Sequence, residues 1–397
     1  MLPPPLPTDP IIVAARRTPI GRAGGALKTV PVEQLLAPVL RSLLIDSGAA
    51  PEAMSDVVIG NAVGPGGNPA RVALLAAGLP MSLPGLTVDR QCGSGLAAIN
   101  LAARLVQAGA GEVYLAGGVE SVSTAPWRIE KPQSLYELPR FSHRARFAPE
   151  ALGDPDMGPA AEAIACTYGI SRDRQDAYAL GSHKKAVTAQ QAGAFDAELV
   201  PVALSAATQV SADECPRPSL TLKRLSRLPP AFDPAGTVTA GNACPINDGA
   251  AAVVVMSRRC FERSGCGAGL RLVDAIAAGV SPEMPGLGPV AATRTLLARH
   301  RKLTLEAVAR VEFNEAFAAQ VLACADQLNL DPERLNVAGG AIALGHPYGA
   351  SGAVLMVRLF SELVRQDMPQ GTLGLATIGV GGGLGISTLV ERVAKGG

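Results

Sequence analysis

The sequence predicts a layered α/β fold made of two similar halves, with a long segment inserted between them. Short runs of β-branched apolar residues alternate along the chain with longer runs rich in alanine and leucine. Buried strands that alternate with helices are typical of α/β layered folds. A second observation is a pattern that occurs twice, and a third is a region near 122–248 that lacks it. At 397 residues the chain is also too long for one ordinary hydrophobic core.

The β-branched runs are the expected strands, because branched side chains pack well on a pleated surface. They cover 11–15, 56–60, 86–90, 113–118, 251–257 and 373–379. The alanine- and leucine-rich runs are the expected helices, because these residues lose little conformational freedom in a helix. They cover 32–47, 94–108, 159–168, 171–192, 304–310, 315–327 and 350–365.

The repeated pattern places a reactive residue before a helix in each half. In the first half a strand and turn lead to Cys92, and in the second a glycine-rich loop leads to His346. Each half also has an earlier strand followed by asparagine: Asn61 precedes Cys92 by 31 positions, and Asn314 precedes His346 by 32. We therefore predict an internal duplication whose halves pack face to face. Chance similarity between two α/β units is the alternative.

The region between the halves differs in composition. It opens with a segment rich in proline and arginine, continues with helical stretches, and ends in an irregular part near 213–232. A long excursion from a compact domain is usually functional, so we expect a lid, a binding loop or an assembly arm.

The composition excludes several classes of protein. Hydrophobic residues make up 48% and charged residues 17%, with a net charge of +1, which argues against disorder and nucleic-acid binding. No apolar run reaches the roughly 18 to 20 residues that a membrane span requires. The seven cysteines include no C-x-x-C pair, and the four histidines lie far apart, which argues against disulfides and metal sites. The N-terminus lacks a signal-peptide pattern, so we expect a cytoplasmic protein.

The stretch VDRQCGSGLAAI (88–99) reads as a strand, a turn and a helix with Cys92 at the turn. The positive end of a helix dipole favours a thiolate there. The glycines at 93 and 95 let a substrate approach the backbone, whose free N–H groups could stabilise an oxyanion. A small buried cysteine is the alternative that the stretch alone leaves open.

Two further residues have both a chemical and a structural interpretation. His346 mirrors Cys92 in the duplication, and a base that activates a thiol must meet it in space rather than in sequence. A lone histidine is, however, more often structural. Asn314 could orient a histidine or hold a water molecule, or it could cap the following helix. The glycine-rich stretch 379–385 matches neither G-x-G-x-x-G nor a P-loop. Its glycines either let the backbone approach a thioester or form a tight strand–loop–strand link.

Many separate blocks, in order along nearly the whole chain, resemble the thiolase family of acyl-CoA acetyltransferases. They include RRTPIGRAGGAL (16–27), VDRQCGSGLAAI (88–99), TAGNACPINDGAA (239–251), NEAFA (314–318), GGAIALGHPYGASG (339–352) and GGGLGIS (381–387). The resemblance implies a duplicated five-layer α-β-α-β-α fold with an inserted loop domain. We expect an N-terminal half at 1–121 plus about 249–270, a substrate-binding and oligomerisation region at 122–248, and a C-terminal half at 271–397.

The resemblance also implies a two-step, ping-pong acyl transfer with coenzyme A as co-substrate and no permanently bound cofactor. Cys92 would take the acyl group as a thioester, and His346 would activate it. Asn314 would hold a water for one oxyanion hole, and the backbone N–H groups of Cys92 and Gly381 would form another. The reaction would cleave a 3-oxoacyl-CoA or join two acyl-CoAs, in a homodimer or homotetramer.

The resemblance further implies a substrate site formed by six residues, each with a plainer alternative. Met157 could be an ordinary core residue, and the side chains of Lys223 and Arg224 could be merely solvated. The six are Met157, Ala243, Cys244, Ala318, Lys223 and Arg224.

The chain departs from the family at two positions. Thiolases usually carry a second cysteine as an acid/base where this chain has Gly379, and such catalysis typically contributes about 10²–10⁴-fold. Cys244 and Pro245 replace a usual serine and glycine in the pantetheine tunnel. Cys244 either lines that tunnel or supplies the missing thiol.

These departures leave three functions open. One is thiolase chemistry with an impaired carbon–carbon step. Another is transfer to a different acceptor, or decarboxylative condensation, with the Cys-His-Asn set alone. The third is a non-catalytic acyl-CoA-binding subunit.

Overall fold

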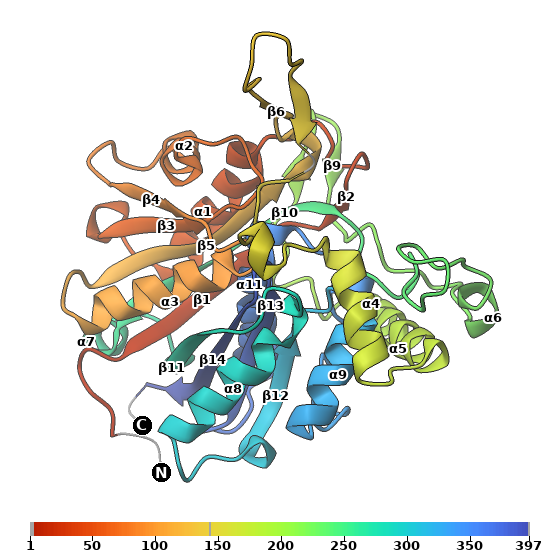
Figure 1. The fold of residues 1–397 in the computed structure, drawn as a ribbon. Coiled ribbons are helices and arrows are strands. Elements are labelled where there is room, and N and C mark those ends of the chain that lie inside the picture. The colour runs from red at the N-terminus through yellow and green to blue at the C-terminus, as the bar shows by residue number, and fades with distance from the viewer. Residues whose placement is uncertain (1–3, 143, 396–397) are drawn as a thin grey trace.

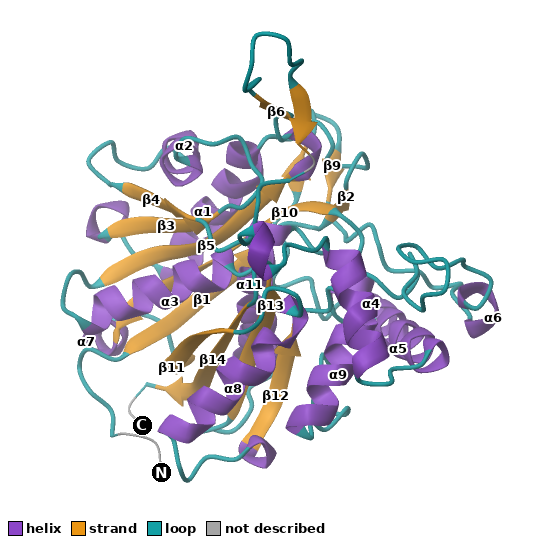
Figure 2. Cartoon of the chain, viewed as in Figure 1, coloured by secondary structure: helices purple, strands orange, loops and turns teal. Residues whose placement is uncertain are grey.

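A computed structural model describes residues 4–142 and 144–395, and its centre is one long mixed sheet (Figures 1 and 2). The strand order is β12-β13-β14-β11-β1-β10-β5-β3-β4, with β2 beside β10. The strands of this sheet are β1 (Pro10–Arg17), β2 (Gly21–Arg22), β3 (Asp56–Gly60), β4 (Gly85–Val88), β5 (Val113–Ser121), β10 (Asn247–Ser257), β11 (Ala268–Gly279), β12 (Val308–Phe313), β13 (Leu373–Val380) and β14 (Leu384–Ala394).

Two small hairpins and a set of helices complete the described chain. The hairpins are β6 (Arg128–Glu130) with β7 (Arg140–Ser142), and β8 (Val202–Ala203) with β9 (Gln209–Val210). The helices are α1 (Val32–Ser47), α2 (Pro69–Ala76), α3 (Ser94–Gln107), α4 (Met157–Thr167), α5 (Arg172–Gln191), α6 (Leu222–Leu225), α7 (Arg258–Arg263), α8 (Gly288–Arg299), α9 (Ala318–Leu328), α10 (Ala341–Leu344) and α11 (Tyr348–Phe360). None of these helices has the length and apolar character needed to cross a bilayer.

The pairing of the strands confirms the internal duplication. In the first half β3 pairs parallel with β5. Strand β10 then pairs antiparallel with β5 on one side and with β1 on the other. In the second half β12, β13, β14 and β11 repeat this sequence of one parallel and two antiparallel pairings. A short antiparallel contact between β1 and β11, at Ile11–Arg271 and Ile12–Leu270, joins the halves into one sheet.

The apolar clusters show that the helices and sheet form the five predicted layers. Leu96 of α3 and Met356 of α11 lie in one apolar cluster with Ala116 of the first half and Ile378 of the second. These two helices therefore form the central layer, and α11 packs against both β5 and β13. Helices α1 and α2 pack on the outer face of the first half, and α8 and α9 on that of the second. The fold prediction is confirmed.

The inserted segment forms a satellite against the second half. Ile164 of α4 packs with Ala319 and Leu322 of α9. The β6–β7 hairpin projects away from the body at the top of Figure 1 and leaves Leu135 and Tyr136 almost fully exposed. The predicted boundaries of the three parts stay a prediction.

One predicted element is wrong. The run 304–310, expected as a helix, is a 3₁₀ turn at Leu305–Ala307 followed by β12. Val308, Val311 and Phe313 are buried in the core of the second half, so burial of β-branched and aromatic side chains outweighs the local helix preference.

Candidate active site

Cys92 lies in a tight turn between β4 and α3, as the sequence predicts. The N–H of Gly93 donates to the carbonyl of Arg90 at 2.9 Å. Ser94 Oγ accepts from the N–H of Arg90 at 2.8 Å and donates to the carbonyl of Gln91 at 2.6 Å. Gln91 has a φ of 46°, in the left-handed region that non-glycine residues rarely adopt. Ser94 therefore holds a strained backbone around the cysteine, a role that sequence reasoning missed.

Cys92 opens onto a cavity of about 750 Å³ that Gly381, Met157 and Tyr348 also line. This volume is within the usual range for small-molecule sites. Much of the remaining wall is apolar, and it includes Val63, Val122, Trp127, Phe141, Phe147 and Ile246.

The thiol of Cys92 is neutral in this environment. Burial raises its pKa to about 12, and Glu120 and Asp89 add to the rise. Backbone N–H groups of Cys92 itself and of Gly381 oppose it by donating toward the sulfur. The side chain is only half-buried because one side faces the cavity, while protein surrounds the rest. A nucleophilic thiolate here requires a base.

His346 is buried and held in one orientation. Its Nδ1 lies 2.6 Å from Ser351 Oγ, and its backbone N–H donates to Asn247 Oδ1 at 2.8 Å. Burial lowers the pKa of the imidazole to about 4, so the ring is neutral at neutral pH. If Ser351 accepts the Nδ1 proton, Nε2 is left as the base. Among the described residues no hydrogen bond joins Cys92 to His346.

Close backbone packing brings the turns of Cys92 and His346 toward each other. A Cβ at Gly95 would lie 2.7 Å from the carbonyl oxygen of Gly349. Glycine is therefore required where the first turns of α3 and α11 cross. His346 does not line the large cavity, but the ring of Tyr348 stands edge-on to it at 5.1 Å.

Asn314 lies directly after β12, where its N–H donates to the carbonyl of Thr377 at 3.0 Å. Its side-chain Nδ2 is buried and has no hydrogen-bond partner in the described chain. The residue lines an internal cavity of about 20 Å³ together with Glu312 and Ser351. That space accommodates one water molecule. The side chains of Asn314 and Ser351 are polar groups that could bind it.

Gly379 lies in β13 opposite Gly385. A Cβ at this position would lie 2.5 Å from Nε2 of Gln320, a buried side chain of α9. The amide of Gln320 thus occupies the space beside the position where the family usually has a cysteine.

Cys244 lies close enough to Cys92 for the two thiols to interact electrostatically. Burial raises the pKa of Cys244, and Cys92 raises it further. The backbone N–H of Cys244 donates to the carbonyl of Ala316 at 2.9 Å, which fixes the segment against the loop after Asn314.

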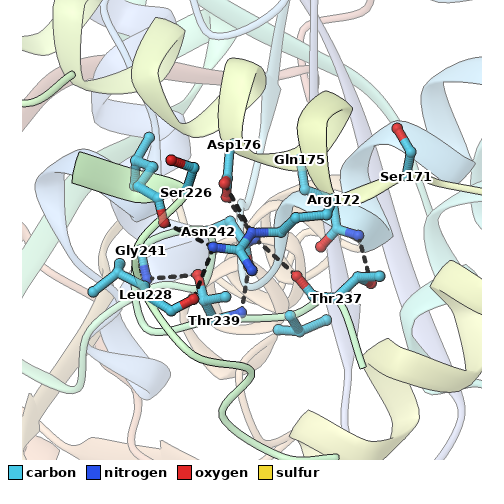
Figure 3. Close-up of polar contacts among 12 residues, drawn as sticks. Ser171, Arg172, Gln175, Asp176, Ser226, Leu228, Thr237, Thr239, Gly241 and Asn242 are labelled. Atoms are coloured by element: carbon cyan, nitrogen blue, oxygen red, sulfur yellow. Dashed lines mark hydrogen bonds and ion pairs between the residues drawn. The ribbon is translucent and has the colours of Figure 1, made fainter. Parts of the chain in front are cut away.

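A polar network on α5 holds the chain that leads to Cys244 (Figure 3). Arg172 Nη2 donates to the carbonyls of Leu225 at 2.7 Å and Leu228 at 3.0 Å. Asp176 accepts from Arg172 at 2.8 Å and from Asn242 at 2.9 Å. Through these bonds α5 supports 225–242 from one side.

Other predicted substrate residues lie apart from the cavity. Ala318 is fully buried in a small cluster with Ala179 and Ile342, and Ala243 pairs with Phe317. Lys223 and Arg224 are exposed on α6, at the right edge of Figure 1, and Arg224 bonds to Ser219. Of the six, Met157 alone lines the cavity, and contact of all six with substrate stays a prediction.

Glu315, the residue after Asn314, connects several segments through hydrogen bonds. It is buried and accepts hydrogen bonds from Tyr178, Ser182, Asn336 and the N–H of Ile342 at 2.7–3.1 Å. No group of three or more potential metal ligands occurs within 4–142 and 144–395.

The comparisons with known proteins agree over nearly the whole chain. Family models for the N-terminal and C-terminal domains of thiolase match residues 10–259 and 268–392. A Staphylococcus haemolyticus protein named "Putative acetyl-CoA C-acetyltransferase VraB" is 46% identical over 97% of this chain and 99% of its own. A Staphylococcus aureus protein of the same name is 45% identical over 96% and 99%.

A solved structure gives the same result. The crystal structure of the Bacillus anthracis acetyl-CoA acetyltransferase has a TM-score of 0.89 and 39% identity, over 97% of this chain and 99% of that one. With the mirrored halves and the shared cavity of Cys92 and Gly381, these matches establish that the chain belongs to the thiolase family.

Proposed function

We propose that this enzyme transfers acyl groups between coenzyme A thioesters through an acyl thioester on Cys92. The observation that carries the proposal is the meeting of Cys92 and Gly381 at one cavity, with their backbone N–H groups directed at the sulfur. Membership of the thiolase family makes the chain an acyltransferase, and relatives are named for acetyl transfer to carbon.

The first step requires a thiolate. His346 Nε2 takes the proton of Cys92 while Ser351 holds the opposite ring nitrogen. The thiolate then attacks the carbonyl carbon of the donor, and the acyl group becomes a thioester as coenzyme A or an enolate leaves. Because burial favours the neutral thiol, the positioned base is essential at neutral pH.

The oxyanion that forms in each step must be stabilised by hydrogen-bond donors. The N–H groups of Cys92 and Gly381 supply one site. The unpartnered Nδ2 of Asn314, with a water molecule, supplies the other. Removing one such donor from an enzyme typically costs about 10²–10³-fold in rate.

A second candidate function rests on Gly379. Without an acid/base at this position, transfer to a nitrogen, oxygen or sulfur acceptor, or decarboxylative condensation, is favoured over Claisen chemistry. Neither reaction requires removal of an α-proton. In both, the acyl–Cys92 step is unchanged.

We also propose that the enzyme acts as a homodimer. Strand β4 is an open edge of the large sheet, and Leu86 on it is exposed, as are Val72, Leu75 and Met81 nearby. An exposed apolar edge strand is usually covered in solution. Light scattering after size-exclusion chromatography should give twice the chain's 40.5 kDa, or four times it for a tetramer; a monomer would contradict the proposal.

Intact-protein mass spectrometry tests the catalytic proposal. The protein is incubated with acetyl-CoA or acetoacetyl-CoA and then with free coenzyme A. One acetyl group should appear on Cys92 and be removed by coenzyme A, and Cys92→Ser should abolish it. The matched control is Cys260→Ser, a cysteine on α7 bonded to Glu112. Absence of acetylation from both donors would leave a non-catalytic binding subunit as the better account.

A further inference from the structure

Carbon–carbon cleavage requires a proton donor that the residues described so far do not supply. This inference rests on the proposed acyl transfer. When Cys92 cleaves a 3-oxoacyl-CoA, the departing acetyl-CoA leaves as an enolate and must be protonated at its α-carbon. Gly379 has no group that can do this.

Two side chains near the gap are unsuitable. The Gln320 amide occupies the space beside Gly379, but an amide N–H does not transfer its proton at neutral pH. Cys244 has a thiol near Cys92, yet it does not line the cavity where substrate must enter.

Tyr348, the first residue of α11, meets the requirements. It lines the cavity that contains Cys92 and Gly381, and its ring packs edge-on against His346, at 89° between planes. The residue is half-buried, and its hydroxyl makes no hydrogen bond to any described protein group, which leaves it available to a substrate in the cavity. Burial raises the pKa of the phenol, and Cys244, Cys92 and Glu120 raise it further, so it remains a proton donor.

We propose that the Tyr348 hydroxyl is the acid that protonates the enolate in the cavity it shares with Cys92. The bond between C2 and C3 breaks, its electron pair goes to C2, and the phenol proton forms the new C2–H bond. Solvent water then returns a proton to the tyrosinate and takes the thiol proton of incoming coenzyme A. The resulting coenzyme A thiolate attacks the acyl–Cys92 thioester, and the released Cys92 sulfur recovers its proton from His346.

The variant Tyr348→Phe removes the hydroxyl and keeps the ring. We expect kcat for thiolysis of acetoacetyl-CoA to fall by about 10²–10⁴-fold. Exchange of acetyl groups between acetyl-CoA and labelled coenzyme A involves no carbon acid, and it should change by less than about threefold. The matched control is Tyr168→Phe, at the end of α4 and partly exposed, which should alter neither reaction.

Adding a thiol to the variant tests proton supply directly. In Tyr348→Phe with Gly379→Cys, cleavage should recover, because the flexible end of Gln320 can turn away from the new side chain. If cleavage is not restored in the double variant, its loss in Tyr348→Phe is due to a changed pocket, and the proposed role of Tyr348 is overturned. Normal thiolysis by Tyr348→Phe, or an equal loss of thiolysis and acetyl exchange, would also overturn that role. Failure of the unaltered enzyme to acylate Cys92 would instead overturn the proposed function.

Discussion

His346 depends on one hydroxyl for its orientation. Ser351 lies on α11, five positions after His346, and its Oγ is the one hydrogen-bond partner of the imidazole among the described residues. Ser351 also lines the small cavity that Asn314 lines, so it connects the proposed base with the asparagine that we propose binds water.

Replacing Ser351 with alanine should slow acylation of Cys92 by about 10–100-fold, the range for losing a group that orients a catalytic or metal-binding histidine. The ring loses the group that selects its tautomer, so kcat should fall more than KM rises. Pre-steady-state acetylation measures this loss, and nitrogen NMR of His346 reports the tautomer. Thr295→Ala, at an exposed position of α8, is the control. An unchanged rate would show that the ring is held by packing alone.

At the scale of elements, α5 acts as a support for the inserted segment. Asn242 donates to Asp176 and to the carbonyl of Thr237, and its Oδ1 accepts from Thr239 at 2.8 Å (Figure 3). These bonds are buried, and they end two residues before Cys244.

Asn242→Ala should therefore loosen 225–242 and reduce stability by about 1–3 kcal/mol, because buried partners lose their hydrogen bonds. Trypsin should cleave faster after Arg224, which directly precedes the supported segment, and after Arg227 within it. Limited proteolysis with mass spectrometry measures the cleavage rate. Ser171→Ala, which removes only the cap of α5, is the control. If trypsin cleaves Asn242→Ala and Ser171→Ala at the same rate, this network does not hold the segment.

At the scale of the whole molecule, a buried ion cluster joins distant parts of the chain. Glu198 accepts from Arg17 at 2.7 Å, from Arg358 at 2.5 Å and from Ser361 at 2.6 Å. Asp213 pairs with the other side of Arg17 at 2.7 Å. Burial alone would raise the pKa of Glu198, but Arg358 and Arg17 lower it below its ordinary value.

Glu198→Gln should cost about 3–5 kcal/mol, because it removes the negative charge that the buried side chains of Arg17 and Arg358 share. Since the folded pKa of Glu198 is lowered, its stabilisation is present above the ordinary carboxyl pKa and is lost as the pH falls below it. Urea unfolding at pH 7 measures the cost. The control is Asp46→Asn, which breaks the exposed pair with Arg16 and should cost about 1 kcal/mol or less. Equal costs would contradict the special role of the buried cluster.

Two buried histidines predict a separate loss of stability in mild acid. Burial lowers the pKa of His183 and of His346 to about 4 each. Between about pH 6.5 and 4 the unfolded chain takes up protons that the folded chain does not, so stability falls across this window. His183→Asn should make that fall shallower while keeping an acceptor for the N–H of Arg217. Unfolding midpoints at several pH values test this, and an unchanged slope would argue against the assignment.

The sequence by itself determined the fold class, the duplication and the enzyme class, and the comparisons confirm the family. It also determined the turn of Cys92, because strand, glycine and helix signals there are local. Tertiary structure decided what lies around that turn. The unpaired amide of Asn314 and the meeting of Cys92, Tyr348 and Gly381 at one cavity depend on how the two halves pack. Cys92 lies hundreds of positions from Tyr348 and Gly381, so no local preference specifies that meeting. Burial also overrode the local helix signal at 304–310, where the core of the second half required a strand.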